Sequence, residues 1–275
     1  MRGLLAASSA ELGGDEPARE AELLLGHALG KSRAWLYAHA DDALDADSAL
    51  RFHALLVRRA AGEPIAYIVG QREFWSLELS VNPDVLIPRP ETELLVDLAL
   101  QRIPQNVPMN IADLGTGSGA IALAIARERP QARVLATDAS RAALAVAREN
   151  AGRLRVGNVE FGQGDWCAAL GGRRFDLLVA NPPYIAQVDT HLQRGDLRFE
   201  PRAALASGAD GLDAIRSIIA AAPAHLQPHA WLLFEHGHDQ GAAARELLAS
   251  SGFVEIFSAV DLEQRERVSG GRASG

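Results

Sequence analysis

The residues best suited to chemistry form a four-residue turn, Asn181-Pro182-Pro183-Tyr184, at the end of the short apolar strand that begins at Leu177. Each proline fixes its own φ, and the residue before a proline is held extended. The chain therefore aims the Asn181 side-chain oxygen and the Pro182 carbonyl away from the strand end. Two such acceptors can hold both N–H bonds of a planar NH2 group and direct its lone pair at an electrophile, while Tyr184 covers its face. The alternative is a rigid Asn-Pro loop without a ligand.

A second motif, "DLGTGSGA" at 113–120, places three glycines between an expected strand and an expected helix. Glycines there permit a tight turn and let a ligand approach the backbone closely, near N–H groups of the helix start. Gly115, Gly117 and Ala120 also satisfy the dinucleotide pattern, so the loop alone does not separate a nicotinamide cofactor from S-adenosylmethionine. The alternative is a glycine-rich turn that binds nothing.

Three further residues follow later expected strands, where an adenosine group could be held. Asp138 lies about twenty residues after the glycine loop, the spacing of a carboxylate that accepts hydrogen bonds from ribose hydroxyls. Its alternative role is an N-cap for the next helix. Asp165 and Trp166 in "GDW" could bond the adenine amino group and cover its face. They could equally be a helix cap followed by a core tryptophan.

These motifs are positioned by an alternation of strands and helices that begins near residue 110. Such a rhythm predicts an α/β fold with a mostly parallel sheet and helices on both faces. Both motifs then lie at the carboxyl edge of the sheet, where open α/β sheets bind ligands. The expected strands are 109–115, 132–138, 158–163, 175–181 and 230–237, and the expected helices include 120–129, 140–151 and 212–222.

The first seventy residues have a different pattern and predict a small helical bundle. Pro17 and Gly30 mark the ends of one helix. A second helix over 45–62 has an apolar stripe of Leu50, Ala54, Val57 and Ala61. Alternating apolar residues at 75–81 and a short strand at 85–87, separated by a turn at 82–84, predict a β-hairpin. Pro90 then begins another helix. We therefore expect a helical domain over 1–70, a hairpin linker over 71–89 and an α/β domain over 90–275.

Composition narrows the possible functions. The chain has 275 residues, 48% of them hydrophobic, and a formal net charge of -8, which disfavours a nucleic-acid backbone as the main partner. Cys167 is the only cysteine, so no intrachain disulfide can form and a reducing compartment fits best. No run is long and apolar enough for a membrane span. We therefore expect a cytoplasmic protein. We also expect no metal, because His236 and His238 have no third ligand at suitable spacing.

Several stretches together resemble the PrmC/HemK family of release factor glutamine methyltransferases. They are "GEPIAYIVGQREFWSLELSVNPDVLIPRPETE" (62–93), "DLGTGSGAIALA" (113–124), "GDW" (164–166), "NPPYI" (181–185) and "LRFEPRAALASGADGL" (197–212). The similarity covers nearly the whole chain. "NPPY" alone is shared with adenine-N6 and cytosine-N4 methyltransferases, whereas "REFWSL" and "IPRPETE" are far more specific.

The resemblance implies a Rossmann-like, seven-stranded class I methyltransferase domain that ends in antiparallel strands near 253–262 and 265–271. It implies methyl transfer from S-adenosylmethionine to the side-chain nitrogen (N5) of the glutamine in the Gly-Gly-Gln motif of release factors one and two, with S-adenosylhomocysteine as product. The helical domain and hairpin would help to dock the release factor, and a monomer is expected, with no direct nucleic-acid or membrane partner.

The resemblance also assigns site residues. Asn181, Pro182 and Tyr184 are the expected catalytic residues, and Pro183 joins them in holding the glutamine amide. The residues expected to bind the cofactor are Gly115, Thr116, Gly117, Ser118, Gly119, Asp138, Asp165, Trp166 and Asn181. One alternative is an adenine-N6 methyltransferase acting on nucleic acid, and another is a release-factor binder without catalysis. The acidic charge disfavours the former, and the intact motifs disfavour the latter.

Overall fold

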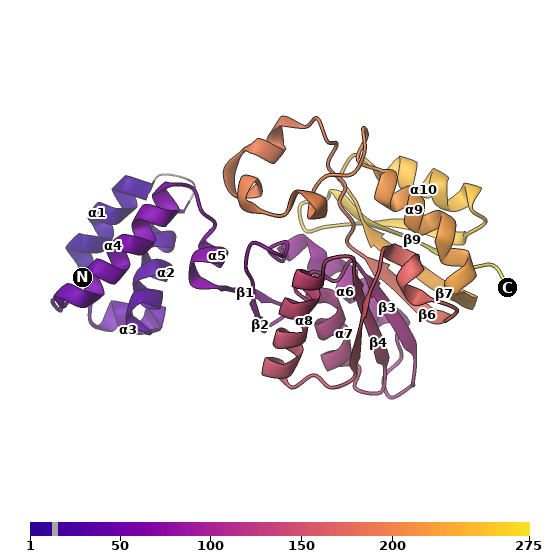
Figure 1. Ribbon diagram of the computed structural model, residues 1–275, viewed down its shortest axis with the longest axis horizontal. Helices are drawn as coiled ribbons and strands as arrows, with labels where there is room; N and C mark the ends of the chain where they lie inside the picture. Colours follow the sequence, from indigo (N-terminus) through magenta and orange to yellow (C-terminus); the bar gives the residue numbers. More distant parts are fainter. Residues whose placement is uncertain (13–15) are drawn as a thin grey trace. The chain divides into compact units, whose positions relative to one another are not determined.

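The computed structural model describes residues 1–12 and 16–275 and divides the chain into two compact units, Met1–Gln71 and Arg72–Gly275 (Figure 1). Each unit has its own cluster of buried apolar side chains. The three-part division at residues 70 and 89 stays a prediction. No helix of the described residues has the length and apolar character needed to cross a membrane.

The first unit is helical, as expected. Its α2 begins at Pro17 and ends before Gly30, which takes a left-handed φ of 62°. Side-chain caps begin two other helices, because Ser32 accepts from the Trp35 N–H and Asp45 accepts from the Ser48 N–H. The helices are α1 (Arg2–Leu12), α2 (Pro17–Leu29), α3 (Arg33–Ala38), α4 (Ala46–Ala60) and α5 (Ile65–Val69).

The apolar stripe predicted for α4 was wrong in its face. Leu50 is 69% exposed and Val57 is 56% exposed. The face that packs against α2 instead carries Phe52 and Leu56. Both faces have helical spacing, so periodicity alone did not distinguish them. Phe52 offers more apolar area than the two alanines of the predicted stripe, and burial of that area stabilises the unit.

The second unit begins with a hairpin whose register differs from the expectation. Strands β1 (Gln71–Phe74) and β2 (Leu77–Ser80) pair around Trp75 and Ser76, which have φ of 52° and 55°. Positive φ at both central residues is typical of the two-residue turns that join antiparallel strands. The turn predicted at 82–84 is present, since the Val85 N–H donates to the Asn82 carbonyl at 3.1 Å, but it does not join two strands. The strand predicted at 85–87 was wrong, because no strand lies between 81 and 89. The side chains of Phe74, Leu77 and Leu79 belong to the core of the second unit.

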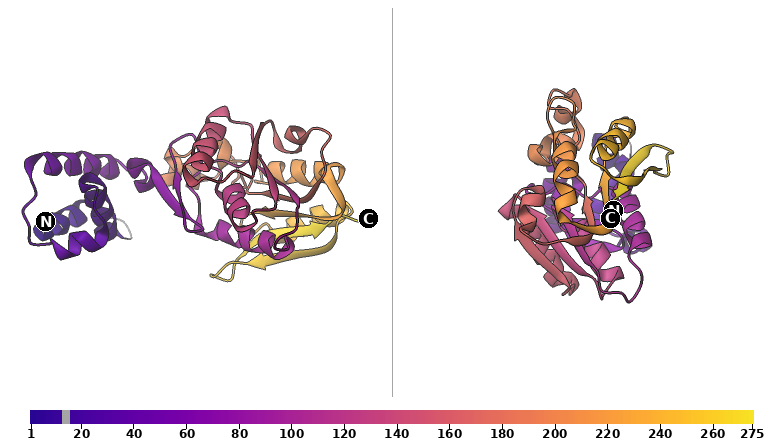
Figure 2. Two further views of the ribbon diagram at one scale, coloured as in Figure 1. Left: turned by 90° about the horizontal axis from the view of Figure 1, so that it is seen from below. Right: turned by 90° about the vertical axis from the view of Figure 1, so that its right-hand side faces the viewer.

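The main sheet has seven strands in the order β5-β4-β3-β6-β7-β9-β8. The first five pair in parallel, and β9 is antiparallel to both of its neighbours. This confirms the expected fold class. The yellow strands β8 and β9 lie side by side at one edge of the sheet (Figure 2). The strands are β3 (Asn110–Leu114), β4 (Arg133–Asp138), β5 (Val159–Gln163), β6 (Phe175–Ala180), β7 (Leu226–Glu235), β8 (Val254–Val260) and β9 (Glu266–Arg272).

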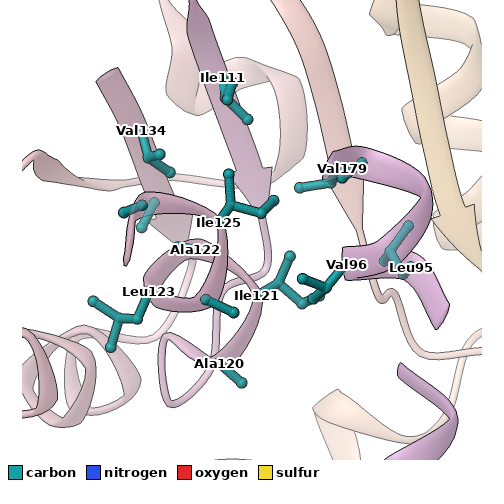
Figure 3. Packing of buried hydrophobic residues seen from close by; sticks show 14 of the residues in the cluster. Leu95, Val96, Ile111, Ala120, Ile121, Ala122, Leu123, Ile125, Val134 and Val179 are labelled. Carbon is teal, nitrogen blue, oxygen red and sulfur yellow. The ribbon is translucent and has the colours of Figure 1, made fainter. Parts of the chain in front are cut away.

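Helices cover both faces of the sheet, because successive side chains of each strand point to opposite faces and both faces are apolar. Ile111 of β3 packs with α6 and α7 (Figure 3), whereas Ala112 and Leu114 pack with α9 and α10 on the opposite face. The α-helices are α6 (Glu93–Arg102), α7 (Ala120–Glu128), α8 (Arg141–Leu154), α9 (Asp213–Ala221) and α10 (Gly241–Ser250). The 3-10 helices are η1 (Pro90–Thr92), η2 (Trp166–Leu170), η3 (Thr190–Gln193), η4 (Gly195–Phe199), η5 (Arg202–Ala204) and η6 (Ala222–His225).

The corrected face of α4 leads to a test on the full chain. Phe52→Ala should lower the free energy of unfolding of the helical unit by about 3 to 5 kcal/mol, because it leaves a cavity in that core. Val57→Ala should change it by less than about 0.5 kcal/mol, because Val57 is mostly exposed. Urea denaturation followed by circular dichroism measures both. Similar losses in the two variants would contradict the assignment of the buried face.

Candidate active site

The site is built where two neighbouring parallel strands end at the same level. Leu114 of β3 is the register partner of Ala180 of β6, so Gly115 and Asn181 follow side by side. Since β4 lies beyond β3 and β7 beyond β6, the chain reverses its direction of strand addition here, which is where open sheets hold ligands. A cavity of about 560 Å³ opens at this edge.

Most of the predicted cofactor residues line this cavity. Those that line it are Gly115, Thr116, Gly117, Ser118, Asp138, Asp165, Trp166 and Asn181, together with Pro183. Gly119, Pro182 and Tyr184 do not line it. Residues to which the sequence analysis gave no role at the site complete the wall, among them Phe74, Arg89, Thr92 and Ser207.

The glycine loop has the backbone that its composition predicts. Gly115, Gly117 and Gly119 have φ of 76°, 56° and 87°. Residues with a Cβ rarely adopt such a backbone conformation. Its N–H groups are largely used inside the protein, however. The N–H groups of Gly115 and Thr116 both donate to the Thr137 carbonyl, and that of Gly117 donates to Asp138. The loop therefore offers close approach to its backbone more than free donors.

Asp113 lies buried beneath this loop and has an unsatisfied oxygen. Its Oδ2 accepts from the Thr116 hydroxyl at 2.6 Å and from the Ala122 N–H at 3.2 Å. Its Oδ1 has no hydrogen-bond partner among the described residues. Burial raises the pKa of this carboxyl to about 7. Asp113 is fully buried and does not itself line the cavity, so its role there is to hold the loop through Thr116 and Ala122.

Asp138 shapes the loop and faces the cavity. Its Oδ2 accepts from the Gly117 N–H at 2.9 Å, and its Oδ1 accepts from the Ser140 N–H at 2.8 Å. The N-cap of α8 is Ser140, whose hydroxyl accepts from the Ala143 N–H, so the capping role considered for Asp138 was wrong. Each carboxylate oxygen retains a lone pair for a further donor.

Asp165 and Trp166 lie at the start of η2, which follows β5. Asp165 occupies the N-cap position of η2 but forms no side-chain cap bond, so its carboxylate is not used as a cap. Trp166 is partly buried, and a Cβ on Gly115 would lie only 2.9 Å from its Cζ3. The indole therefore packs directly against the first loop glycine and forms a flat wall of the cavity.

The Asn-Pro-Pro-Tyr turn is held by two residues that the motifs did not reveal. The Asn181 Nδ2 donates to the Thr92 Oγ1 at 3.0 Å, and the Thr92 hydroxyl donates to the Glu235 Oε2 at 2.6 Å. The Tyr184 hydroxyl donates to the Glu235 Oε1 at 3.2 Å. One buried carboxylate thus reaches both ends of the turn.

Glu235 is the last residue of β7 and is fully buried. Burial raises the pKa of its carboxyl to about 7, while hydrogen bonds from Thr92 and Tyr184 oppose that rise. Burial also raises the pKa of the Tyr184 hydroxyl. Sequence reasoning singled out the adjacent His236 instead, which bonds the Gly237 carbonyl and the Ser269 hydroxyl at 2.8 Å each. Residues 1–12 and 16–275 contain no acidic, histidine or cysteine cluster suited to a metal.

The segment 87–92, which sequence reasoning left without a role, is anchored at both ends. The Ile87 N–H donates to the Glu200 Oε2 at 3.0 Å, and Arg89 forms an ion pair with the same buried carboxylate. Thr92 then reaches Asn181. The segment therefore connects "FEPRAAL" to the Asn-Pro-Pro-Tyr turn, and its Pro88, Arg89 and Thr92 line the cavity.

Asn150 of α8 is a further buried polar residue that no motif indicated. Its Oδ1 accepts from the Ser80 N–H at 2.7 Å, and its Nδ2 donates to the carbonyls of Ser80 and Ser118. The hairpin strand β2 and the glycine loop are thus joined through one side chain. A helix-interior asparagine gives no sequence signal of such a bridge, because its partners lie far away along the chain.

The sheet order, with its cavity at the switch point between β3 and β6, is a Rossmann-like, seven-stranded α/β fold. Solved structures share the fold, including a methyltransferase from Pyrococcus furiosus at 16% identity and a TM-score of 0.53, which covers 81% of this chain and 98% of that chain. A T. thermophilus 16S rRNA N2 G1207 methyltransferase, solved with AdoMet and guanosine, has 19% identity and a TM-score of 0.55 over 74% of this chain and 49% of that one.

Sequence comparisons define the family. The model of the PrmC N-terminal domain matches residues 4–70, and that of the methyltransferase small domain matches residues 92–200. A release factor glutamine methyltransferase of Xylella fastidiosa is 56% identical over 93% of each chain. That of Burkholderia pseudomallei is 54% identical over 98% of this chain and 97% of its own. The chain belongs to the family of release factor glutamine methyltransferases, which confirms the resemblance and the prediction of an enzyme.

The buried Glu235 predicts a pH dependence of stability. Its pKa is about 7 in the folded protein against an ordinary value of 4.5. Above pH 5, ionisation of Glu235 therefore lowers the stability of the wild-type protein, whereas a glutamine does not ionise. The stability of Glu235→Gln relative to wild type should therefore increase by about 2 to 3 kcal/mol between pH 5 and pH 8. Urea denaturation at several pH values measures this difference. Asp113 titrates in both proteins and cancels, so a constant difference would contradict the burial argument.

Proposed function

We propose that the chain transfers a methyl group from S-adenosylmethionine to the N5 side-chain nitrogen of the glutamine in the Gly-Gly-Gln motif of bacterial release factors one and two. The observation that carries this proposal is the adjacency of Gly115 and Asn181 at the ends of paired strands, in a chain of this family. The glycine loop faces the methyl donor, and the Asn-Pro-Pro-Tyr turn faces the acceptor.

The residues around the cavity fit this donor. Its volume of about 560 Å³ is within the range of small-molecule sites. The positive φ of Gly115 and Gly117, which both line the cavity, lets the ligand approach the backbone. Asp138 is proposed to accept from the ribose hydroxyls, and Asp165 and Trp166 are proposed to contact the adenine. When bound, S-adenosylmethionine supplies an electrophilic methyl group on a sulfonium.

The proposed chemistry of the turn needs neither a metal nor a strong base. An amide nitrogen is a poor nucleophile because its lone pair is delocalised. The Asn181 Oδ1 and the Pro182 carbonyl accept hydrogen bonds from its two N–H groups. These bonds favour a pyramidal nitrogen and stabilise the positive charge that develops there. The nitrogen forms the new N–C bond as the bond from the methyl carbon to sulfur breaks, which leaves S-adenosylhomocysteine, and the nitrogen then loses one proton to solvent. Correct alignment supplies much of the rate.

Tyr184 has a second role in this proposal. Its ring is predicted to cover the planar face of the amide, although it does not line the cavity. Its hydroxyl bond to Glu235 and the bond from the Gln240 side chain to its carbonyl at 3.0 Å hold the turn in place. Pro183, which lines the cavity, is proposed to limit how deeply the glutamine enters.

The proposal includes a protein partner and its setting. The helical unit and the hairpin are proposed to dock the release factor, and the enzyme is proposed to act as a monomer in the cytoplasm, where translation ends. Nucleic acid is not a proposed substrate, because the chain has a net charge of -8 and phosphate binding depends on clustered cations.

A methylation assay tests the function directly. The protein is incubated with a release factor and labelled S-adenosylmethionine, and the modified peptide is mapped by mass spectrometry. We expect label on the Gly-Gly-Gln glutamine and none on a release factor in which that glutamine is alanine. Label on other residues, or on bare DNA or RNA in place of the release factor, would contradict the proposal.

Two variants separate the roles of the donor and acceptor sides. Asn181→Ala should lower kcat about 100-fold to 1,000-fold, because it removes an acceptor that acts on the developing charge, and should change the Kd for S-adenosylmethionine less than about threefold. Asp138→Ala should instead raise that Kd by about tenfold or more, since it loses charge-assisted hydrogen bonds.

Single-turnover kinetics and calorimetry give these two quantities. Asn110→Ala is the matched control for Asn181, because Asn110 is an exposed asparagine at the opposite end of β3. It should leave both quantities near their wild-type values. Equal losses of kcat and cofactor affinity in Asn181→Ala would be inconsistent with the acceptor role.

A further inference from the structure

We propose that Thr92 and Glu235 act as positioning residues, forming a directional hydrogen-bond relay that turns the Asn181 amide so that its Oδ1 faces the substrate nitrogen. The relay consists of Asn181, Thr92, Glu235 and Tyr184, joined by bonds of 3.0, 2.6 and 3.2 Å. This inference rests on the proposed function, because it concerns the acceptor that grips the glutamine amide.

The direction of the relay follows from counting hydrogens. An ionised Glu235 carboxylate can only accept, and Thr92 has one hydroxyl hydrogen, which it must give to the carboxylate. The Thr92 oxygen can then only accept from its other neighbour, which is the Asn181 side chain. The NH2 group of Asn181 is the one part of that amide able to donate. Its Oδ1 is consequently turned away from Thr92.

The released oxygen is in position to act. Asn181 lines the cavity, and its Oδ1 accepts no hydrogen bond from residues 1–12 or 16–275. An unoriented asparagine would present its NH2 group half of the time, and that group would repel an incoming N–H donor. The relay removes this alternative before the substrate arrives, which is preorganisation of an acceptor.

The relay connects three separate parts of the second unit. Thr92 is 4% exposed and belongs to η1, Asn181 and Tyr184 follow β6, and Glu235 ends β7. The short 2.6 Å bond is typical of a hydroxyl that donates to an ionised carboxylate. Burial strengthens such bonds, because water does not compete for either group.

Protonation of Glu235 should abolish the fixed direction of hydrogen-bond donation along the relay. A neutral carboxyl has a hydrogen of its own, so Thr92 is free to donate to the Asn181 Oδ1 instead. Burial raises the pKa of this carboxyl to about 7, so the loss of direction is expected as the pH falls through about 7. The titratable and charged groups near Glu235 are the Tyr184 hydroxyl, Arg267 of β9, Glu91 of η1 and the adjacent His236. Arg267 lowers the pKa, whereas Glu91 raises it.

Kinetics of matched variants test the relay. Wild-type kcat, with both substrates saturating, should rise about fivefold to tenfold from pH 6 to pH 8 as Glu235 ionises. Thr92→Val keeps the shape of the side chain but loses the hydroxyl, and should lower kcat at pH 8 about tenfold to 100-fold and remove the rise. Thr92→Ser should recover most of both. The Kd for S-adenosylmethionine should change less than threefold throughout.

A second readout does not depend on turnover. The carboxyl carbon of Glu235, followed by NMR in labelled protein without substrates, should titrate at higher pH in Thr92→Val than in wild type, because the bond from Thr92 favours the ionised form. Thr92→Ser should titrate as wild type does. Ser269→Ala removes another buried hydroxyl outside the relay, and should preserve the Glu235 titration and the pH dependence of kcat.

Three results would overturn the relay. They are an unchanged pH rise in Thr92→Val, equal losses in Thr92→Ser and Thr92→Val, and a Glu235 titration that Thr92→Val does not move. Glu235→Gln, which should lose the pH rise with Thr92 intact, keeps the test decisive if Thr92→Val fails to fold. Wild type that leaves the Gly-Gly-Gln glutamine unmodified would refute the proposed function, while the NMR titration would still judge the relay.

Discussion

The parallel pairing of β3 with β6 is the constraint on which the site depends. Because Leu114 and Ala180 are register partners, the two strands end together and the chain leaves both at the same level. The glycine loop and the Asn-Pro-Pro-Tyr turn are thereby held as neighbours by backbone hydrogen bonds of the core, not by contacts between mobile loops. Ile111 packs on one face of the sheet, and Ala112 and Leu114 pack on the other. A shift of one residue would exchange the side chains of the two buried faces, so core packing also protects the site geometry.

Two buried carboxyl groups lie just beneath this edge, and they show where stability is given up for function. Asp113 and Glu235 each lie near the carboxyl end of a central strand, and burial raises the pKa of both to about 7. An apolar side chain at either position would fold at lower cost. Their hydroxyl partners explain why the groups are tolerated, since Thr116 and Thr92 each donate at 2.6 Å. Asp113 differs from Glu235 in that one of its oxygens has no donor among the described residues.

The parts of the fold that sequence could predict are those governed by local rules. Alternating strands and helices, the glycine positions and the two prolines after β6 depend on backbone preferences that short stretches carry. The face of α4 and the turn at Trp75 and Ser76 were mistaken because both depend on packing partners outside the stretch itself. Thr92, Asn150, Glu200 and Glu235 were missed for the same reason. Each bonds a residue at least 70 positions away, and no spacing along the chain signals such a bond.

These long-range bonds also change how the segment 87–92 is understood. Each proline, at 88 and 90, holds the preceding residue extended, so Ile87 and Arg89 lie outside a helix, and η1 begins only at Pro90. The Ile87 N–H, the Arg89 guanidinium and the Thr92 hydroxyl have no acceptors within the segment. They bond instead to Glu200 and Glu235, which come from distant parts of the chain. A segment with few internal hydrogen bonds must take its order from what surrounds it. The acceptor turn and the "FEPRAAL" wall are therefore positioned together through one rigid strip, and a disturbance of either would be felt at Asn181.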